Sequence, residues 1–165
     1  MKDILYSPWR IKYILSKKEK ECIFCLKPSA EHDEKHLILY RSKNSFVIMN
    51  AFPYNNGHLM VVPNKHASEL NDLSTDEICN LFETVRLCEK VLKKVYSPDG
   101  LNIGLNLGKS AGAGIDDHLH VHIVPRWSGD VNFMTTTAGT RVIPESFEKA
   151  YKQLKEQFDN ERVEK

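Results

Sequence analysis

The stretch His118-Leu119-His120-Val121-His122-Ile123-Val124-Pro125 carries more structural information than any other part of the chain. Histidine alternates with apolar residues in it, a pattern that is typical of a β-strand with one buried face. Successive side chains of a strand point to opposite faces, so the three histidines share one face and the apolar residues share the other. The pattern therefore predicts a strand over His118–Pro125 whose exposed face is made of imidazoles.

Alternate residues of a strand lie roughly 6.5–7 Å apart, so three such imidazoles can converge on one small anionic group. One interpretation is a solvated, histidine-rich face, but three of only seven histidines fall on this short segment. A second is a three-histidine metal site for hydrolysis, which lacks a nearby carboxylate base other than Asp116 and Asp117. The third is a nucleophilic histidine whose neighbours orient it and hold charge.

A glycine-rich loop, Gly108-Lys109-Ser110-Ala111-Gly112-Ala113-Gly114, directly precedes the histidine segment. Gly112 and Gly114 allow the backbone to approach a ligand closely, and successive N–H groups in such turns form an anion-binding nest. Lys109 and Ser110 offer further donors. Such a loop often only connects strands, but its position beside the histidines predicts a phosphate cradle and favours the nucleophile.

The rest of the chain supplies the framework around this segment. Apolar runs bounded by turn residues predict further strands over 37–40, 45–49, 58–62 and 101–107. Ser74 and Glu77 have the spacing of a capping box, and apolar residues then recur at helical spacing until Pro98. A second helical pattern follows Pro144. We therefore predict an α+β fold, an antiparallel sheet of about five strands with helices packed on one face.

The composition sets limits on function. A chain of 165 residues with 41% hydrophobic and 27% charged residues is typical of one globular domain. The net charge of +1 argues against a general nucleic-acid binder. No apolar run reaches membrane-spanning length, and the first residues lack the pattern of a signal peptide. We therefore expect a cytoplasmic protein without a membrane partner, whose four cysteines are reduced thiols or metal ligands.

The motif His118-x-His120-x-His122, followed by Ile123-Val124, resembles the signature of the histidine triad (HIT) family of nucleotide hydrolases and nucleotidyl transferases. The segment Asn50–Pro63 resembles the ribose-binding segment of that family, and the likeness covers residues 22–127. The stretches that resemble the branch acting as bacterial diadenosine tetraphosphate phosphorylases are Ser7–Arg10, Asn102–Gly108 and Pro125–Phe133.

The resemblance implies roles for individual residues. His120 is the nucleophile that becomes a nucleotidyl-histidine, and His122 bonds a phosphate oxygen or the bridging oxygen. Asn50 holds the ribose hydroxyls and Asn106 the α-phosphate. The residues that contact the phosphate chain are Ser110, Gly112 and Gly114. Many hydrolase relatives carry glutamine near the last of these positions, so its absence here weighs against a simple hydrolase.

Cys22-Ile23-Phe24-Cys25 has the Cys-x-x-Cys spacing, which is ambiguous between a metal site, a redox pair and neither. Some triad relatives complete such a pair with two histidines, and His66 and His118 occupy those positions here. The resemblance therefore implies a structural zinc site; the alternative is a pair of reduced thiols. The triad requires no divalent metal, although magnesium can accompany a polyphosphate substrate.

We expect three parts of the chain: a lead-in segment at 1–21, a HIT domain at 22–132 and a C-terminal extension with a helix at 133–165. The implied function is cleavage of dinucleoside polyphosphates, with nucleotide and inorganic phosphate as partners, giving ATP and ADP from diadenosine tetraphosphate. The alternatives are hydrolysis of dinucleoside polyphosphates or nucleoside phosphoramidates, and a nucleotide-binding regulatory module. We also expect a homodimer in which residues after Asn132 contribute to the partner's substrate pocket.

Overall fold

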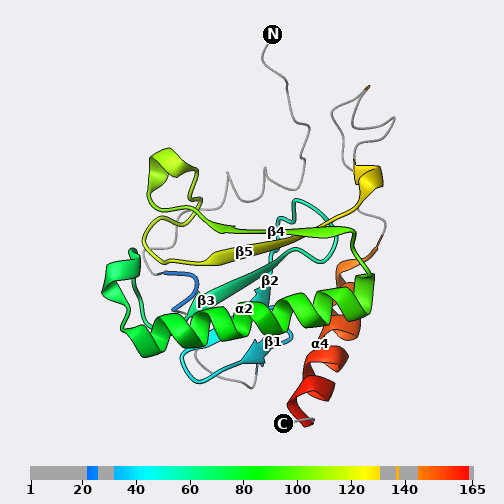
Figure 1. Cartoon of the computed structure of the whole chain (residues 1–165), viewed down its shortest axis with the longest axis horizontal. Coiled ribbons are helices and arrows are strands. Elements are labelled where there is room, and N and C mark those ends of the chain that lie inside the picture. Colours follow the sequence, from blue (N-terminus) through cyan, green and yellow to red (C-terminus); the bar gives the residue numbers. More distant parts are fainter. Residues whose placement is uncertain (1–21, 26–31, 131–136, 138–144, 164–165) are drawn as a thin grey trace.

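The computed structural model describes residues 22–25, 32–130, 137 and 145–163 (Figure 1). The expected lead-in segment at 1–21 lies outside these residues, as does the segment just after Asn132 that we expect to reach a partner's pocket. Among the described residues, no helix combines the length and apolar character needed to cross a membrane.

The centre of the molecule is one antiparallel sheet with the strand order β1-β2-β3-β5-β4. Its strands are β1 (Ile38–Arg41), β2 (Ser45–Met49), β3 (Leu59–Pro63), β4 (Gly100–Leu105) and β5 (Val121–Arg126). Figure 1 shows β1 and β4 at the two edges. The predicted α+β fold with about five antiparallel strands is therefore confirmed.

The histidine strand begins later than predicted, at Val121 instead of His118. Pairing between β3 and β5 ends at Val61↔Val121, and beyond it the amide of Leu119 donates to the carbonyl of Ala67 at 2.6 Å. Pro63, which closes β3, has no N–H group with which to continue a ladder. The first two histidines of the motif therefore precede the regular strand.

Two helices cover one face of the sheet, α2 (Thr75–Tyr96) and α4 (Phe147–Val163) (Figure 1). The predicted capping box forms at the start of α2, with Ser74 and Glu77 bonding each other's backbone. Three short 3-10 turns complete the described elements: η2 (Leu70–Asp72), η3 (Lys109–Ala111) and η4 (Ser128–Asp130). Alternate strand residues pack against both helices to form the main core, which includes Val47, Val61, Val121, Leu81, Leu92, Leu154 and Phe158.

The opposite face of the sheet is covered by the short segment 22–25. Phe24 is 3% exposed and packs there with Ile48 and Met60 in a second apolar cluster. In the sheet register, Met60 lies beside His122, so this cluster and the histidines share a face. One face of the sheet thus holds the helices, and the other is left for a functional site.

Candidate active site and metal centre

His120 is a buried imidazole with one ring nitrogen committed to the backbone. Its Nδ1 lies 2.9 Å from the carbonyl oxygen of His118, and the residue is 5% exposed. A carbonyl oxygen can only accept, so Nδ1 carries the proton and Nε2 keeps a lone pair. Burial lowers the pKa of His120 below its ordinary value, so the ring is neutral near pH 7. A neutral imidazole with a lone pair at Nε2 is a competent nucleophile.

Hydrogen bonds that run from Tyr54 through His58 fix the tautomer of His122. The backbone N–H of Tyr54 donates to Nδ1 of His58 at 3.1 Å, and Nε2 of His58 lies 2.9 Å from Nδ1 of His122. Because an amide can only donate, His58 carries its proton on Nε2 and donates it to His122. His122 then carries its own proton on Nε2. It therefore offers an N–H donor beside His120, whose ring centroid lies 4.8 Å away.

Both members of this imidazole pair stay neutral well below neutral pH. Burial, followed by repulsion from His122 and His120, lowers the pKa of His58 to about 3. Burial, followed by repulsion from His120, lowers the pKa of His122 to about 4. The ring of Tyr54 covers them, with its centroid 4.8 Å from that of His58. The site therefore presents hydrogen-bond donors and a lone pair without a fixed positive charge.

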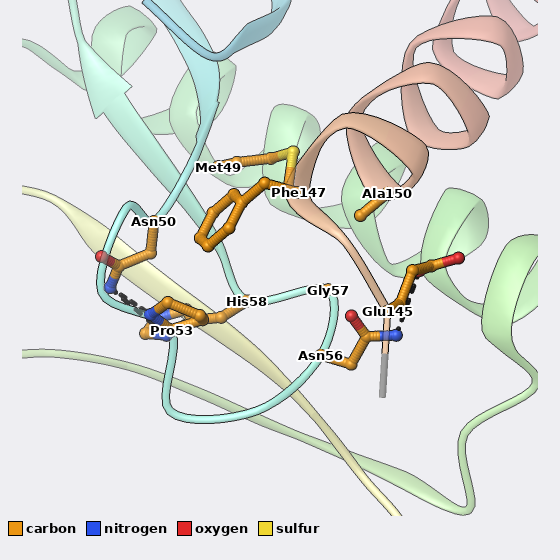
Figure 2. Close-up of a pocket in the computed structure, with 9 residues that line it drawn as sticks. All are labelled: Met49, Asn50, Pro53, Asn56, Gly57, His58, Glu145, Phe147 and Ala150. Carbon is orange, nitrogen blue, oxygen red and sulfur yellow. Dashed lines mark hydrogen bonds between the residues drawn. The ribbon is translucent and has the colours of Figure 1, made fainter. Parts of the chain in front are cut away.

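Asn50 lies at the end of β2, close to the buried imidazole of His58. Its Oδ1 accepts the backbone N–H of Phe52 at 2.9 Å, which directs its Nδ2 group toward the ring of His58 at 3.3 Å (Figure 2). The structure thus places Asn50, the expected ribose-binding residue, against the imidazole of His58.

The glycine-rich loop folds on itself around η3. The N–H groups of Ala111 and Ala113 donate to the carbonyl of Gly108, and that of Gly112 donates to Lys109. These donors are engaged within the loop, so they do not form the expected anion-binding nest in this conformation. A Cβ at Gly112 would lie 3.9 Å from Nδ2 of Asn106, which places two expected phosphate-binding residues side by side.

Two other expected phosphate ligands, Ser110 and Gly114, lie on the exposed surface of this loop. Nζ of Lys109 lies 3.6 Å from a carboxylate oxygen of Asp116. This carboxylate therefore pairs with the one cationic side chain of the loop.

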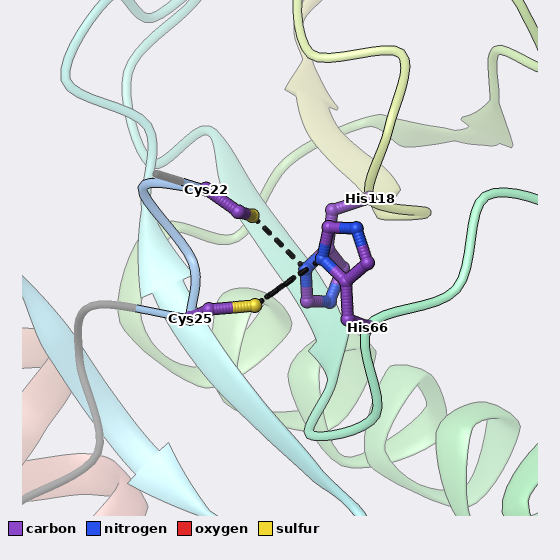
Figure 3. Close-up of side chains that lie close together, drawn as sticks. All are labelled: Cys22, Cys25, His66 and His118. Atoms are coloured by element: carbon purple, nitrogen blue, oxygen red, sulfur yellow. Dashed lines mark hydrogen bonds between the residues drawn. The ribbon is translucent and has the colours of Figure 1, made fainter. Parts of the chain in front are cut away.

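A separate cluster gathers Cys22, Cys25, His66 and His118, whose ligand atoms all lie within 4.8 Å of one another (Figure 3). Nδ1 of His118 lies 3.2 Å from Sγ of Cys22, and Nδ1 of His66 lies 3.2 Å from Sγ of Cys25. A tetrahedral zinc ion with ordinary bond lengths separates its sulfur and nitrogen ligands by about 3.6 Å. The four residues therefore fit a divalent cation and could hold one.

The tautomer of His118 supports metal binding. Its Nε2 lies 2.9 Å from the carbonyl oxygen of Pro63, so this nitrogen carries the proton and Nδ1 faces the thiols with a lone pair. A backbone acceptor of this kind commonly orients metal-binding histidines. Burial, followed by the neighbouring Cys22 and then Asp117, raises the pKa of the Cys25 thiol. A cation between the thiols would offset that effect.

Two features of the site differ from the first geometric expectation. His118 faces the cysteines and does not join His120 and His122 on one anion, because the chain turns before the strand begins. His58 was not among the expected site residues, although it is 2% exposed and fixes the tautomer of His122. The available signal was its position directly after the Asn-Asn-Gly turn, as the first and only polar residue of the apolar run predicted as a strand over 58–62.

Comparison with known proteins agrees with this geometry. A family profile described as the HIT domain matches residues 31–129. An AP-4-A phosphorylase of Mycobacterium tuberculosis is 41% identical over 149 residues, 86% of this chain and 76% of the relative. An asymmetrical bis(5'-nucleosyl)-tetraphosphatase of Schizosaccharomyces pombe is 39% identical over 93 residues, 56% of this chain and 50% of the relative.

Solved structures show the same fold. A hypothetical histidine triad nucleotide-binding protein of Sulfolobus tokodaii superimposes with a TM-score of 0.66 at 29% identity, covering 84% of this chain and 93% of that one. A zinc-bound histidine triad family protein of Mycobacterium smegmatis superimposes with a TM-score of 0.69 at 24% identity, covering 88% and 98%. From its sequence, its fold and its arrangement of histidines, the protein is an enzyme of the histidine triad (HIT) family.

Proposed function

We propose that the protein cleaves dinucleoside polyphosphates by nucleotidyl transfer through His120, with inorganic phosphate as the acceptor. The observation that carries this proposal is the 41% identity to an AP-4-A phosphorylase over 86% of the chain. The neutral imidazole of His120, with its lone pair at Nε2, supplies the chemistry that such a transfer needs.

In the first half of the reaction, Nε2 of His120 attacks the α-phosphorus of diadenosine tetraphosphate. A bond from nitrogen to phosphorus forms, the bond to the bridging oxygen breaks, and ATP leaves with that electron pair. The leaving triphosphate is a stable anion. The Nε2–H group of His122 donates a hydrogen bond to the phosphate oxygens as charge develops on them. Asn50, beside His58, holds the ribose of the transferred nucleotide.

In the second half, an oxygen of inorganic phosphate attacks the same phosphorus. The bond to His120 breaks, its electron pair returns to Nε2, and ADP is released. Asn106 contacts the phosphates in both halves, and Gly112 beside it leaves room for them, since its own N–H group donates to Lys109. The acceptor phosphate meets Lys109 and Ser110 on the same loop.

We propose that the Cys22, Cys25, His66 and His118 cluster binds zinc in a structural role. Its four ligands are supplied by the protein, which is typical of structural sites and leaves no position for substrate. The related zinc-bound protein of Mycobacterium smegmatis has the same fold. Bound zinc would hold the segment 22–25, and hence Phe24, against the sheet face that carries the histidines.

The reaction is tested by incubating the protein with diadenosine tetraphosphate and oxygen-18-labelled phosphate and separating the nucleotides. Phosphorolysis yields ADP and ATP, with the label in the β-phosphate of ADP and none in ATP. AMP and ATP as the main products, with no label in either, would contradict the choice of acceptor while leaving the covalent half of the reaction intact.

Hydrolysis is the second candidate, and the relative from Schizosaccharomyces pombe favours it, since that protein is named an asymmetrical tetraphosphatase. Water would then open the same nucleotidyl-histidine. The match to it covers 56% of this chain, against 86% for the phosphorylase, and we therefore prefer phosphate as the acceptor.

We also propose a homodimer formed through the edge of the sheet at β4. Gly100–Gly108 contains no charged residue, although charges commonly protect exposed strand edges. Ile103 is 44% exposed and Leu107 is 43% exposed on this segment. A second copy can cover this edge by pairing β4 with its symmetry-related strand.

Sedimentation equilibrium tests this assembly. The wild-type protein should sediment as a dimer at micromolar concentration, and Ile103→Lys should shift it toward monomer because a buried charge is costly. A wild-type monomer under these conditions would contradict the assembly.

A further inference from the structure

The turn Asn55-Asn56-Gly57 directly precedes His58 and determines how that imidazole is held. The amide of His58 donates to the carbonyl of Asn55 at 3.2 Å, and the amide of Tyr54 donates to Nδ1 of the same ring at 3.1 Å. A displacement of this turn would therefore move His58, and with it the hydrogen bond that fixes the proton on His122.

The side chain of Asn55 is held by the end of the histidine strand. Its Nδ2 donates to Oδ1 of Asp130 at 2.8 Å and to the carbonyl of Pro125 at 3.0 Å. Oδ2 of Asp130 accepts from Nε of Arg126 at 2.6 Å, and the Asp130 side chain is 8% exposed. The two oxygens of this carboxylate thus serve two different donors.

The side chain of Asn56 is held by the C-terminal part of the chain. Its Nδ2 donates to Oε2 of Glu145 at 3.2 Å (Figure 2). The hydroxyl of Tyr96 donates to the same oxygen at 2.9 Å. The Glu145 side chain is 11% exposed, and its other oxygen lies 3.5 Å from Nζ of Lys149. Burial, followed by the neighbouring Glu145, raises the pKa of Tyr96, so its hydroxyl stays a donor.

Gly57 allows the ring of Tyr96 to lie directly against the turn. A Cβ at this position would lie 2.7 Å from a ring carbon of Tyr96, and the φ angle of Gly57 is +70°. Asn56 and Gly57 of this turn, together with Asn50, His58 and Glu145, line a small pocket beside the imidazole of His58 (Figure 2). The turn is therefore packed on one side and bonded at both of its asparagines.

We propose that Asp130 and Glu145 form a carboxylate clamp on the two asparagines, and that this clamp positions His58, and through it His122, for the reaction. Neither carboxylate touches the substrate in this account; both are positioning residues. The clamp makes the segment before α4 part of the active-site support. The kinetic consequence of the clamp rests on the proposed function.

The arrangement of oxygens makes an asymmetric prediction. Asn56 and Tyr96 both donate to Oε2 of Glu145. Glu145→Gln can therefore keep both hydrogen bonds through its amide oxygen. Glu145→Ala loses them. Asp130→Asn has one oxygen for two donors, so it must lose a bond to either Asn55 or Arg126. Lys149→Ala removes only an exposed ion pair on the outer side of Glu145 and is the matched control.

Steady-state kinetics with diadenosine tetraphosphate and phosphate measure the first consequence. We expect Glu145→Ala and Asp130→Asn to lower kcat about ten-fold or more, because small displacements of a reacting group are costly. KM should change less, since nucleotide contacts are largely kept. Glu145→Gln and Lys149→Ala should stay within about two-fold of wild type, because the first keeps an oxygen for both donors and the second removes only an exposed ion pair.

A spectroscopic readout separates the clamp from the proposed function. Nitrogen-15 NMR of the imidazoles reports which ring nitrogen is protonated, with no substrate present. Wild type, Glu145→Gln and Lys149→Ala should show His122 protonated on Nε2 alone, whereas Glu145→Ala and Asn56→Ala should show a mixture of tautomers. If the protein fails to phosphorolyse the substrate but these spectra change as stated, the clamp stands and the function fails.

Two results would overturn the clamp. One is a folded Glu145→Ala protein, judged by its melting transition, with wild-type kcat and an unchanged His122 spectrum. The other is an equal loss of activity in Glu145→Gln and Glu145→Ala, because that would show that the charge matters and the shared oxygen does not. Should Glu145→Ala not fold, Asn56→Ala removes the same bond from the turn side and decides the question.

Discussion

The candidate metal cluster and the candidate catalytic histidines use imidazoles that are two residues apart in the chain, yet they expose opposite ring nitrogens. His118 bonds the carbonyl of Pro63 through Nε2 and offers Nδ1 to the thiols. His120 bonds the carbonyl of His118 through Nδ1 and leaves Nε2 with a lone pair. The backbone acceptor that each ring meets therefore decides which nitrogen remains for chemistry.

The two regions are also linked mechanically. Phe24, between the two cysteines, lies 5.4 Å from the ring of His118 and 5.4 Å from that of His120, as measured between centroids. A change in the cluster can thus reach His120 through one buried aromatic ring. The comparison predicts that substitution of His120 or His122 lowers kcat directly. Substitution of a cluster residue should instead lower the stability of the fold first, and activity as a consequence.

The largest effect should follow replacement of the nucleophile. His120→Asn should lower kcat by about three orders of magnitude or more while nucleotide binding and the melting temperature change little. His32→Asn, at an exposed histidine, is the matched control. A variant that keeps more than about a tenth of wild-type activity, a factor worth about 1.4 kcal/mol, is incompatible with a covalent intermediate at His120.

The next effect concerns the metal. Purified protein should contain zinc, and Cys22→Ser should lower the zinc content and reduce the melting temperature by about 5–10 °C, the shift expected for a loss of about 2–3 kcal/mol. Enzymatic activity should fall in parallel with the melting temperature. Cys79→Ser changes an exposed thiol outside the cluster and should leave both quantities unchanged. Elemental analysis that finds no zinc in protein prepared without chelator would reject the site.

A third effect appears in the dependence of stability on pH. The pKa of His58 is about 3 and that of His122 about 4, whereas both are about 6.5 in an unfolded chain. Between these values the unfolded chain binds more protons, so the free energy of unfolding must fall as the pH falls below about 6.5. His58→Asn should reduce this slope by up to about 1.4 kcal/mol per pH unit.

Urea denaturation at several pH values between 6.5 and 4 measures that slope. The His58→Asn protein is expected to be less stable at pH 7, so the slope is the decisive quantity and not the absolute stability. An unchanged slope would show that His58 is not buried in its neutral form.

The smallest effect concerns the glycine-rich loop. The carboxylate of Asp116 lies 3.6 Å from the ammonium of Lys109, and both are solvent-accessible, so the pair contributes little to stability. Asp116→Asn should release Lys109 and lower the KM for phosphate about two- to three-fold, with no change in melting temperature. A higher KM for phosphate would show that Lys109 does not face the acceptor.

Much of this arrangement was predictable because it depends on local patterns. The alternation around His120 identified the strand and its buried face, and the capping box of Ser74 and Glu77 located the start of α2. The four residues of the cluster were grouped by resemblance, and the structure places them together. These features can be predicted from residues that are close together in the sequence or from a family motif.

The remaining features depend on contacts between distant segments. The tautomers of His118 and His122 follow from acceptors and donors at Pro63 and Tyr54, which no spacing reveals. The internal hydrogen bonds of the glycine-rich loop were likewise not predictable, since its composition permits either a nest or a closed turn. The role of Glu145 requires the C-terminal chain to return to the Asn56 turn.

The central claim, that His120 carries the nucleotide covalently, is tested most directly by intact-protein mass spectrometry of a quenched reaction. Protein mixed with diadenosine tetraphosphate in phosphate-free buffer should gain the mass of one adenylyl group, and peptide mapping should place it on His120. Added phosphate should then remove the adduct and release ADP. An adduct on another residue, or turnover to products with no adduct under any quench condition, would contradict the account.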